Sequence, residues 1–170
     1  IVSCGTCMDQ LLKYQFNKIF PGCRLLDIHE YLLEKGVTLT NKDNLIEANV
    51  ERSSQSRQSV RYMYHDPCHS PMKTYQPLKV VSELTGTNVP LSDRCCGEAG
   101  TFGVALPHIA TQVRFRKEEE LRKGADVLRA DGFGGKIKIL TSCPACQQGL
   151  SRYDDDINST SDYVVVEMAK

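Results

Sequence analysis

The chain has no excess of either charge and no long apolar run. Its 170 residues include 21 lysines and arginines and 21 aspartates and glutamates, so the formal net charge is zero. A neutral chain lacks the basic field that attracts phosphate backbones and anionic lipids, and we expect no binding to nucleic acid or directly to a membrane surface. Its longest apolar runs, such as residues 164–166, fall far short of the roughly 20 residues of a membrane helix, so no transmembrane segment is expected.

The chain also lacks a recognisable signal peptide and the cysteine pattern of a secreted scaffold. It begins at Ile1, with no initiator methionine, basic segment or long apolar segment. Its eight cysteines include two C-x-x-C pairs and one adjacent pair. This pattern favours metal or redox chemistry in a reducing compartment over a disulfide framework. Cys23 belongs to no motif and is expected to be a small buried apolar residue.

Hydrophobic periodicity predicts alternating strands and helices. Strands are expected at residues 1–3, 25–26, 60–64, 137–140 and 163–166. Helices are expected from the first C-x-x-C to about residue 19, at 28–35, 76–84 and 109–128, and after residue 143. The alternation indicates an α/β fold with Rossmann-like layers, a mostly parallel sheet and helices on both faces.

An internal repeat suggests how the chain is divided. Residues 1–14 align without a gap on residues 140–153, with a serine, both cysteines, a leucine, a basic residue and a tyrosine at matching positions. We therefore interpret residues 1–40 as the tail of a first unit, 41–59 as a polar linker, and 60–170 as a second, nearly complete unit. The partners of Cys4 and Cys7 are expected upstream of Ile1, so these two cysteines form an incomplete second site.

The second unit contains five cysteines that follow predicted strands or lead into helices: Cys68, Cys95, Cys96, Cys143 and Cys146. In an open parallel sheet such loops gather outside the carboxyl ends of the strands, where ligands bind. Adjacent cysteines seldom form a disulfide with each other, but they can face one metal centre. Four thiolates suit zinc, iron–sulfur clusters are also held by thiolates, and a dithiol can exchange disulfides without metal. The spacing alone leaves all three chemistries open.

Three motifs in order carry a family resemblance. They are H-D-P-C-H at 65–69, C-C-G-x-x-G at 95–100 and C-P-A-C at 143–146. Together they resemble the cysteine-rich CCG domain of the heterodisulfide reductase B-subunit family, which also occurs in iron–sulfur subunits of glycolate oxidase and in lactate-utilisation proteins. Members commonly carry two such units in tandem, as the internal repeat suggests here.

The resemblance implies an iron–sulfur cluster held by the five cysteines of the second unit, in the best-understood members a non-cubane 4Fe-4S cluster. Zinc, which related domains also hold, is the alternative metal. His65 and His69 flank Cys68 and are expected either to hydrogen-bond near the cluster or to pack the loop. Gly97 is expected to let the backbone approach the cluster closely. Glu98 is expected to be a solvated loop carboxylate.

The resemblance also implies a role in electron transfer. A flavin dehydrogenase domain or subunit would oxidise a small hydroxy acid, and the cluster would pass the electrons to a quinone or another acceptor. The FAD would lie in a missing domain or a partner, so this chain, as a carboxyl-terminal fragment, is not expected to be catalytic alone. A cytoplasmic location follows, with partners holding the protein at the membrane periphery. The alternative functions are a structural zinc or partner-docking module and a thiol–disulfide redox module.

Overall fold

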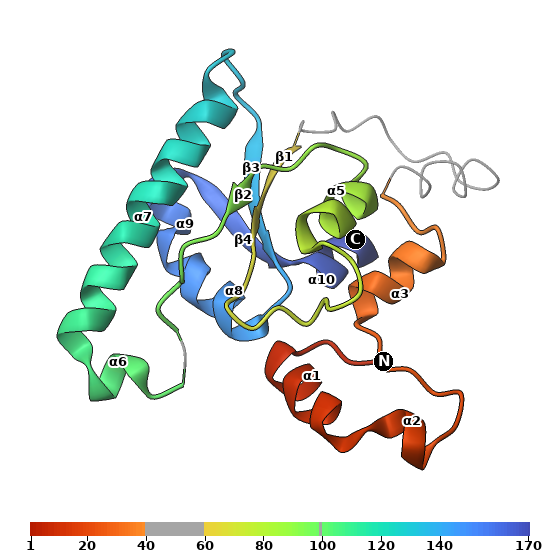
Figure 1. The fold of residues 1–170 in the computed structure, drawn as a ribbon. Coiled ribbons are helices and arrows are strands. Elements are labelled where there is room, and N and C mark those ends of the chain that lie inside the picture. The colour runs from red at the N-terminus through yellow and green to blue at the C-terminus, as the bar shows by residue number, and fades with distance from the viewer. Residues whose placement is uncertain (40–59, 99) are drawn as a thin grey trace.

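The fold is built on a four-stranded parallel sheet (Figure 1). The computed structural model describes residues 1–39, 60–98 and 100–170. The strands are β1 (Val60–His65), β2 (Leu91–Ser92), β3 (Lys136–Thr141) and β4 (Ser159–Tyr163), in the order β2-β1-β3-β4. Each neighbouring pair is parallel, which confirms the predicted α/β fold with a parallel sheet.

One face of the sheet packs against three helices: α3 (Ile28–Glu34), α5 (Pro77–Thr85) and α10 (Val164–Ala169). Alternate residues of a strand point to opposite faces, and Tyr62 and Tyr64 of β1 lie on this one, with Leu140 of β3. The helices contribute buried apolar residues such as Val80 and Val164. This layer contains no cysteine of the predicted site among its core residues.

The opposite face packs against α7 (Pro107–Arg129), α8 (Pro144–Leu150) and α9 (Asp154–Ile157). Figure 1 shows α7 running beside the sheet on the side away from α5 and α10. Met63 and Ile139 point into this layer, together with Leu121 of α7. Cys96 and Cys146 are part of the same buried cluster, so two of the predicted ligands are built into the core.

Shorter elements complete the described chain. They are α1 (Gly5–Leu11), η1 (Leu12–Tyr14), α2 (Phe16–Ile19), α6 (Phe102–Ala105) and η2 (Ser151–Tyr153). The part of the chain that the structure describes has no helix long and apolar enough to cross a membrane. The predicted linker at 41–59 lies outside the described residues.

The longer predicted elements are confirmed, and their ends have clear local causes. α3 begins at a capping box, because the Asp27 carboxylate accepts from the amide of His29 while Glu30 reaches back to the amide of Asp27. α5 begins with Pro77 and is followed by Gly86, whose φ of 68° is the left-handed conformation common after a helix. α7 covers the whole of the predicted helix at 109–128.

The predicted strand from Tyr163 to Val166 is wrong. β4 ends at Tyr163, and the three valines that follow form the first turn of α10. Val164 is fully buried, whereas Val166 is 46% exposed. A short apolar run does not by itself distinguish a buried strand from a buried helix, which is why the pattern misled.

Three further predictions for the amino-terminal segment differ from the structure. The predicted helix up to Ile19 is interrupted at Gln15, whose φ of 48° is left-handed. The predicted strands at 1–3 and 25–26 reduce to one parallel bridge between Val2 and Asp27. Cys23 is exposed, because it lies in the loop between α2 and α3 and not in a packed element.

The two repeated segments have the same local conformation. α1 and α8 begin and end at aligned residues, and so do η1 and η2. The residues before the two helices, Cys4 and Cys143, have φ/ψ values of −135°/125° and −131°/121°. The likeness ends after η1 and η2, where Gln15 is left-handed and Asp154 is right-handed. The division into two units stays our hypothesis, and this shared local geometry is consistent with it.

Candidate metal centre

The site lies where the strand order of the sheet reverses. β2 lies on one side of β1, while β3 and β4 lie on the other. Loops that leave the carboxyl ends of β1 and β3 therefore diverge and leave a crevice, which is the usual ligand position in open parallel sheets. Cys68 follows β1 and Cys143 follows β3, and α8 starts directly after Cys143.

All five predicted ligands line one cavity of about 280 Å³ at this edge. The sulfur-bearing residues around it are Cys4, Cys68, Cys95, Cys96, Cys143 and Cys146. Sequence reasoning assigned Cys4 to a separate, incomplete site and so missed its position in this wall. Cys7, its partner in the C-x-x-C pair, is exposed and is not one of the lining residues. All eight cysteines of the chain are free thiols.

The most buried part of the site joins three donor groups. The sulfur atoms of Cys96 and Cys146 are 3.4 Å apart and hydrogen-bonded. The ring of His65 is fully buried, and one of its nitrogens lies within 4.8 Å of both sulfur atoms. Its Nδ1 is 3.1 Å from the carbonyl oxygen of Ser92, whereas its Nε2 has no hydrogen-bond partner among the described residues. Nitrogen and sulfur donors this close together are typical of a metal centre.

The thiols have different proton affinities. The Cys146 thiol, and then the nearby His65 imidazole and the Glu98 amide, lower the pKa of Cys96 to about 4 despite its burial. The Cys146 thiol and the first amides of α8 lower the pKa of Cys143 to about 6. Hydrogen bonding to Cys143 and Cys96 raises the pKa of Cys146 itself. Burial, and then the neighbouring Cys95, raises the pKa of Cys68 to about 11.

These shifts suit a metal-binding site. Thiolate is the form of cysteine that binds metal, and the lowered pKa values of Cys96 and Cys143 favour that form. The thiols that keep their protons can lose them as a cation binds, because metal binding competes with protons for the same sulfur atoms. The number, burial and clustering of the sulfur atoms therefore fit a thiolate-bound metal or an iron–sulfur cluster.

A family model described as a cysteine-rich domain, CCG, matches residues 62–151. That match covers more than half of the chain and contains all five cysteines of the cavity that belong to the predicted second unit. The chain belongs to the cysteine-rich CCG domain family. Its cysteine pair at 95–96 and the glycine that follows are the CCG motif.

Several proteins similar to this chain carry the names of redox proteins or their subunits. The B subunit of fumarate reductase (CoM/CoB) from Methanothermobacter marburgensis is 25% identical over 153 residues, which cover 86% of this chain and 26% of that protein. Lactate utilization protein A 2 of Bacillus cereus is 25% identical over 173 residues, which cover 87% of this chain and 69% of that protein. The glycolate oxidase iron-sulfur subunit of Escherichia coli is 31% identical over 100 residues, which cover 56% of this chain and 22% of that protein. No solved structure matches the chain.

The loop that carries the CCG motif is held tightly against α7 and α8. Gly97 has a φ of 77°, and a Cβ atom there would lie 3.2 Å from Cγ of Arg114. Glu98 forms ion pairs with Arg114, at 3.3 Å, and with Arg152. A Cβ atom on Gly149 of α8 would overlap the side chain of Glu98. Glu98 is therefore a clamp between the CCG loop and two helical elements, and the expectation of a solvated carboxylate is wrong because its partners lie far along the chain.

A buried lysine supports the segment that leads into the CCG motif. Lys117 of α7 is fully buried and donates to the carbonyl and hydroxyl oxygens of Ser92, and to Glu120 at 2.8 Å. The hydroxyl of Ser92 in turn donates to Glu120 at 2.7 Å. Burial lowers the pKa of Lys117, against the opposing effect of Glu120. The sequence shows only an acidic run at 118–120, and nothing in it marks Lys117 as turned inward.

The amino-terminal segment packs against the loop that carries Cys68. The Nδ1 atom of His69 is 2.9 Å from a carboxylate oxygen of Asp9, and Lys73 is 2.8 Å from the other oxygen. Lys73 and then His69 lower the pKa of Asp9. A Cβ atom on Gly5 would overlap the carbonyl oxygen of His69, so only glycine permits this approach. His69 thus connects the two parts of the chain, while His65 faces the thiols.

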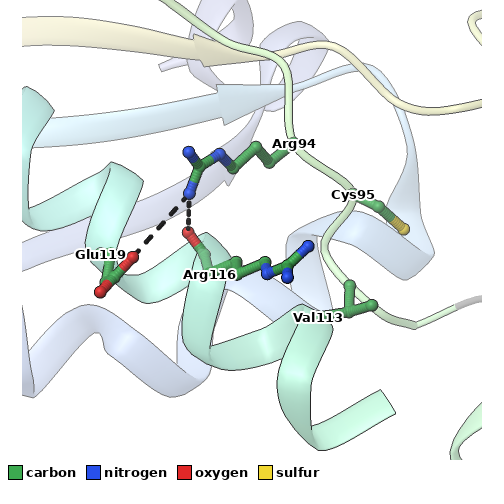
Figure 2. Close-up of a pocket in the computed structure, with 5 residues that line it drawn as sticks. All are labelled: Arg94, Cys95, Val113, Arg116 and Glu119. Carbon is green, nitrogen blue, oxygen red and sulfur yellow. Dashed lines mark hydrogen bonds and ion pairs between the residues drawn. The ribbon is translucent and has the colours of Figure 1, made fainter. Parts of the chain in front are cut away.

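A second, more open cavity of about 440 Å³ adjoins the CCG motif (Figure 2). It is lined by Arg94, Cys95, Val113, Arg116 and Glu119. Arg94 donates to the carbonyl oxygen of Arg116 at 3.0 Å and pairs with Glu119 at 4.0 Å. Figure 2 shows the sulfur of Cys95 pointing away from Arg94 and Glu119. Cys95 therefore separates this basic surface from the thiol cavity, which it also lines.

Proposed function

We propose that the chain is the iron–sulfur electron-transfer module of an oxidoreductase. The observation that carries the proposal is the convergence of five cysteines of the CCG domain on one cavity at the reversal point of a parallel sheet. Thiolates are the usual ligands of iron–sulfur clusters. The name of the glycolate oxidase iron-sulfur subunit, which is 31% identical over the matched residues, supports the same chemistry.

The proposed ligands are Cys68, Cys95, Cys96, Cys143 and Cys146. A bound cluster would accept and release electrons one at a time. The protein's part is to present sulfur in a partly dehydrated pocket: Cys96 and Cys146 are buried, and Cys143 lies half-buried at the start of α8. The Glu98 clamp and the buried Lys117 hold the CCG loop in the position that points its thiols inward.

The finer parts of the proposal concern the cluster type and the partners. We propose a non-cubane 4Fe-4S cluster, because five thiols exceed the four that a cubane needs. We propose that a flavin dehydrogenase domain or subunit supplies the electrons and oxidises a small hydroxy acid, as the names of the lactate and glycolate relatives suggest. The chain spans only part of these relatives, and the FAD belongs in this proposal to a missing domain or partner. The assembly would act in the cytoplasm, at the membrane periphery through its partners.

The test of this function is the metal content of protein purified without oxygen, since free thiols and exposed clusters oxidise in air. We expect iron, acid-labile sulfide and broad visible absorption in the unmodified chain. Cys96→Ser should lose most of the iron, because Cys96 is the buried thiolate of the site. Cys23→Ser is the matched control and should keep its iron, because Cys23 is exposed and lies outside the cavity. A colourless protein that binds zinc in place of iron would contradict the proposal.

A structural zinc site is the second candidate. The observation that favours it is the compact set of His65, Cys96 and Cys146, since zinc binds imidazole nitrogen and thiolate sulfur together. In that case the chain would be a docking module without electron transfer. The same metal analysis separates the two candidates, because zinc gives no visible absorption and carries no sulfide.

A further inference from the structure

His65 is the last residue of β1 and is fully buried beside Cys96 and Cys146. A donor nitrogen of its ring lies within 4.8 Å of the sulfur atoms of both Cys96 and Cys146. His69 lines the open part of the cavity, but its side chain is 70% exposed and its Nδ1 is engaged by Asp9. The two histidines of the H-D-P-C-H motif therefore have different surroundings, and His65 is the one whose ring nitrogen lies beside both buried sulfur atoms.

The hydrogen bond at the other ring nitrogen defines the tautomer of His65. Its Nδ1 is 3.1 Å from the carbonyl oxygen of Ser92. A carbonyl oxygen only accepts, so Nδ1 carries a hydrogen, and Nε2 is the ring nitrogen left to bind a metal. The carbonyl is itself fixed, because Lys117 donates to it at 3.3 Å and Ser92 is buried. A metal-binding histidine usually donates its second ring nitrogen to a backbone carbonyl in this way.

The remaining nitrogen is buried and unpartnered. Nε2 of His65 has no hydrogen-bond partner among the described residues, although buried polar atoms are normally paired. Leaving a buried polar atom unpaired costs free energy. A metal ion bound by the nitrogen and both sulfur atoms satisfies all three groups.

We propose that Nε2 of His65 is a direct metal ligand beside Cys96 and Cys146, so that the site has a mixed nitrogen and sulfur donor set. If the metal is iron, this inference rests on the proposed function, because the iron atom would then belong to the cluster. A neutral imidazole in place of a negative thiolate raises the reduction potential of an iron–sulfur centre. His65 would then set the potential at which this module accepts electrons.

The decisive measurement uses the unmodified chain. We expect pulsed electron paramagnetic resonance of the paramagnetic cluster to show a nitrogen coupling of the size of a directly bonded imidazole, and [¹⁵N]histidine labelling to change it to the pattern of the heavier isotope. A coupling of the much smaller size produced by a hydrogen bond, or none, would overturn the inference. Because no residue is changed, this result does not depend on whether a variant folds.

Variants assign the nitrogen to one histidine. His65→Ala should abolish the coupling, and His65→Cys should abolish it while lowering the reduction potential, since thiolate replaces imidazole. His69→Ala is the matched control, and the coupling should stay as in the unmodified chain. If the coupling disappears in His69→Ala and survives in His65→Ala, the assignment is wrong.

Iron analysis keeps this inference separate from the proposed function. Protein that holds iron and sulfide but shows no directly bonded nitrogen supports the function and overturns the role of His65. If the protein holds no iron, the proposed function fails, and the role of His65 is then tested with Co²⁺ as the probe. X-ray absorption of the Co²⁺-loaded chain should show a nitrogen ligand beside sulfur that is absent in His65→Ala, and an all-sulfur shell in the unmodified chain would overturn the inference.

Discussion

At the scale of single residues, the cysteines of the site are unequal. Cys96 and Cys146 are core residues packed with Met63 and Leu150, whereas Cys68 is exposed at the rim of the cavity. A change at a buried cysteine thus alters both packing and ligation, while a change at Cys68 alters ligation with less effect on the core. Two glycines near the cysteines are closely packed against one residue each: a Cβ atom would overlap His69 at Gly5 and Glu98 at Gly149.

Gly149→Ala tests how closely α8 approaches the CCG loop. Alanine favours a helix by about 1 kcal/mol over glycine, but its Cβ atom would overlap Glu98, which two arginines hold in place. Overpacking costs about 1–3 kcal/mol, so after the gain in helix propensity we expect the free energy of unfolding, measured with denaturant, to fall by up to about 2 kcal/mol. Gly134→Ala is the control and should cause no loss, because nothing lies within 4 Å of its Cβ position.

The double variant Gly149→Ala/Glu98→Ala identifies the cause of that loss. If the overlap with Glu98 is responsible, adding Gly149→Ala to Glu98→Ala should no longer destabilise the chain, and the two changes will be strongly non-additive. If Gly149→Ala lowers the free energy of unfolding equally with and without the Glu98 side chain, the overlap with Glu98 is not the cause of the loss.

At the scale of elements, α7 is the support of the CCG motif. The helix contributes Arg114 to the clamp on Glu98 and Lys117 to the network around Ser92, from positions three residues apart that share one helix face. α8 acts from the other side, since its first amides lower the pKa of Cys143. The loop lies between these two helices, so its shape is determined by them and by its own glycine.

Lys117→Ala tests this support. The change leaves the Ser92 carbonyl with only His65 as donor and takes the buried ammonium away from Glu120, and a hydrogen bond to a charged group is worth about 1.5–3 kcal/mol. We expect a loss of that size in the free energy of unfolding, together with faster amide hydrogen exchange in residues 92–98. Lys123→Ala on the same helix is exposed and should change stability by no more than about 0.5 kcal/mol. Equal effects of the two variants would remove the structural role assigned to Lys117.

At the scale of the whole molecule, the metal site shares only one of the two apolar core layers. The layer of α3, α5 and α10 packs on the sheet with no cysteine in its buried cluster. The other layer contains Cys96 and Cys146, but also Leu121, Ile139 and Ile157. A domain with this much apolar core differs from a small zinc finger, which needs its metal in order to fold.

We therefore expect the chain to stay folded after metal removal. Chelation under reducing conditions should lower the melting temperature, because a ligand that binds only the folded state stabilises it, while the far-ultraviolet circular dichroism is retained. Increased hydrogen exchange should be confined to the loops at 66–70, 93–98 and 142–146. Collapse of the circular dichroism signal on chelation would mean that the metal is required for the fold itself.

The long elements of this protein could be predicted because their signals are local. The periodicity of α7 and the proline and glycine at the ends of α5 are visible in neighbouring residues, and so are the cysteine motifs of the site. The valines of α10 could not be assigned correctly, because a short apolar run is equally compatible with a strand and a helix. β2, with two residues, is too short to have a pattern of its own.

By itself the sequence determined the α/β class and the kind of chemistry, because strand and helix periods and cysteine spacing are properties of residues close together in the chain. Only the tertiary structure decided which groups surround the thiols. The position of Cys4 in the cavity wall, the unpartnered nitrogen of His65, the arginine clamp on Glu98 and the buried Lys117 all depend on contacts between distant segments. Those contacts form when the carboxyl ends of β1 and β3 meet at one edge of the sheet, and residues that are close together in the sequence do not indicate them.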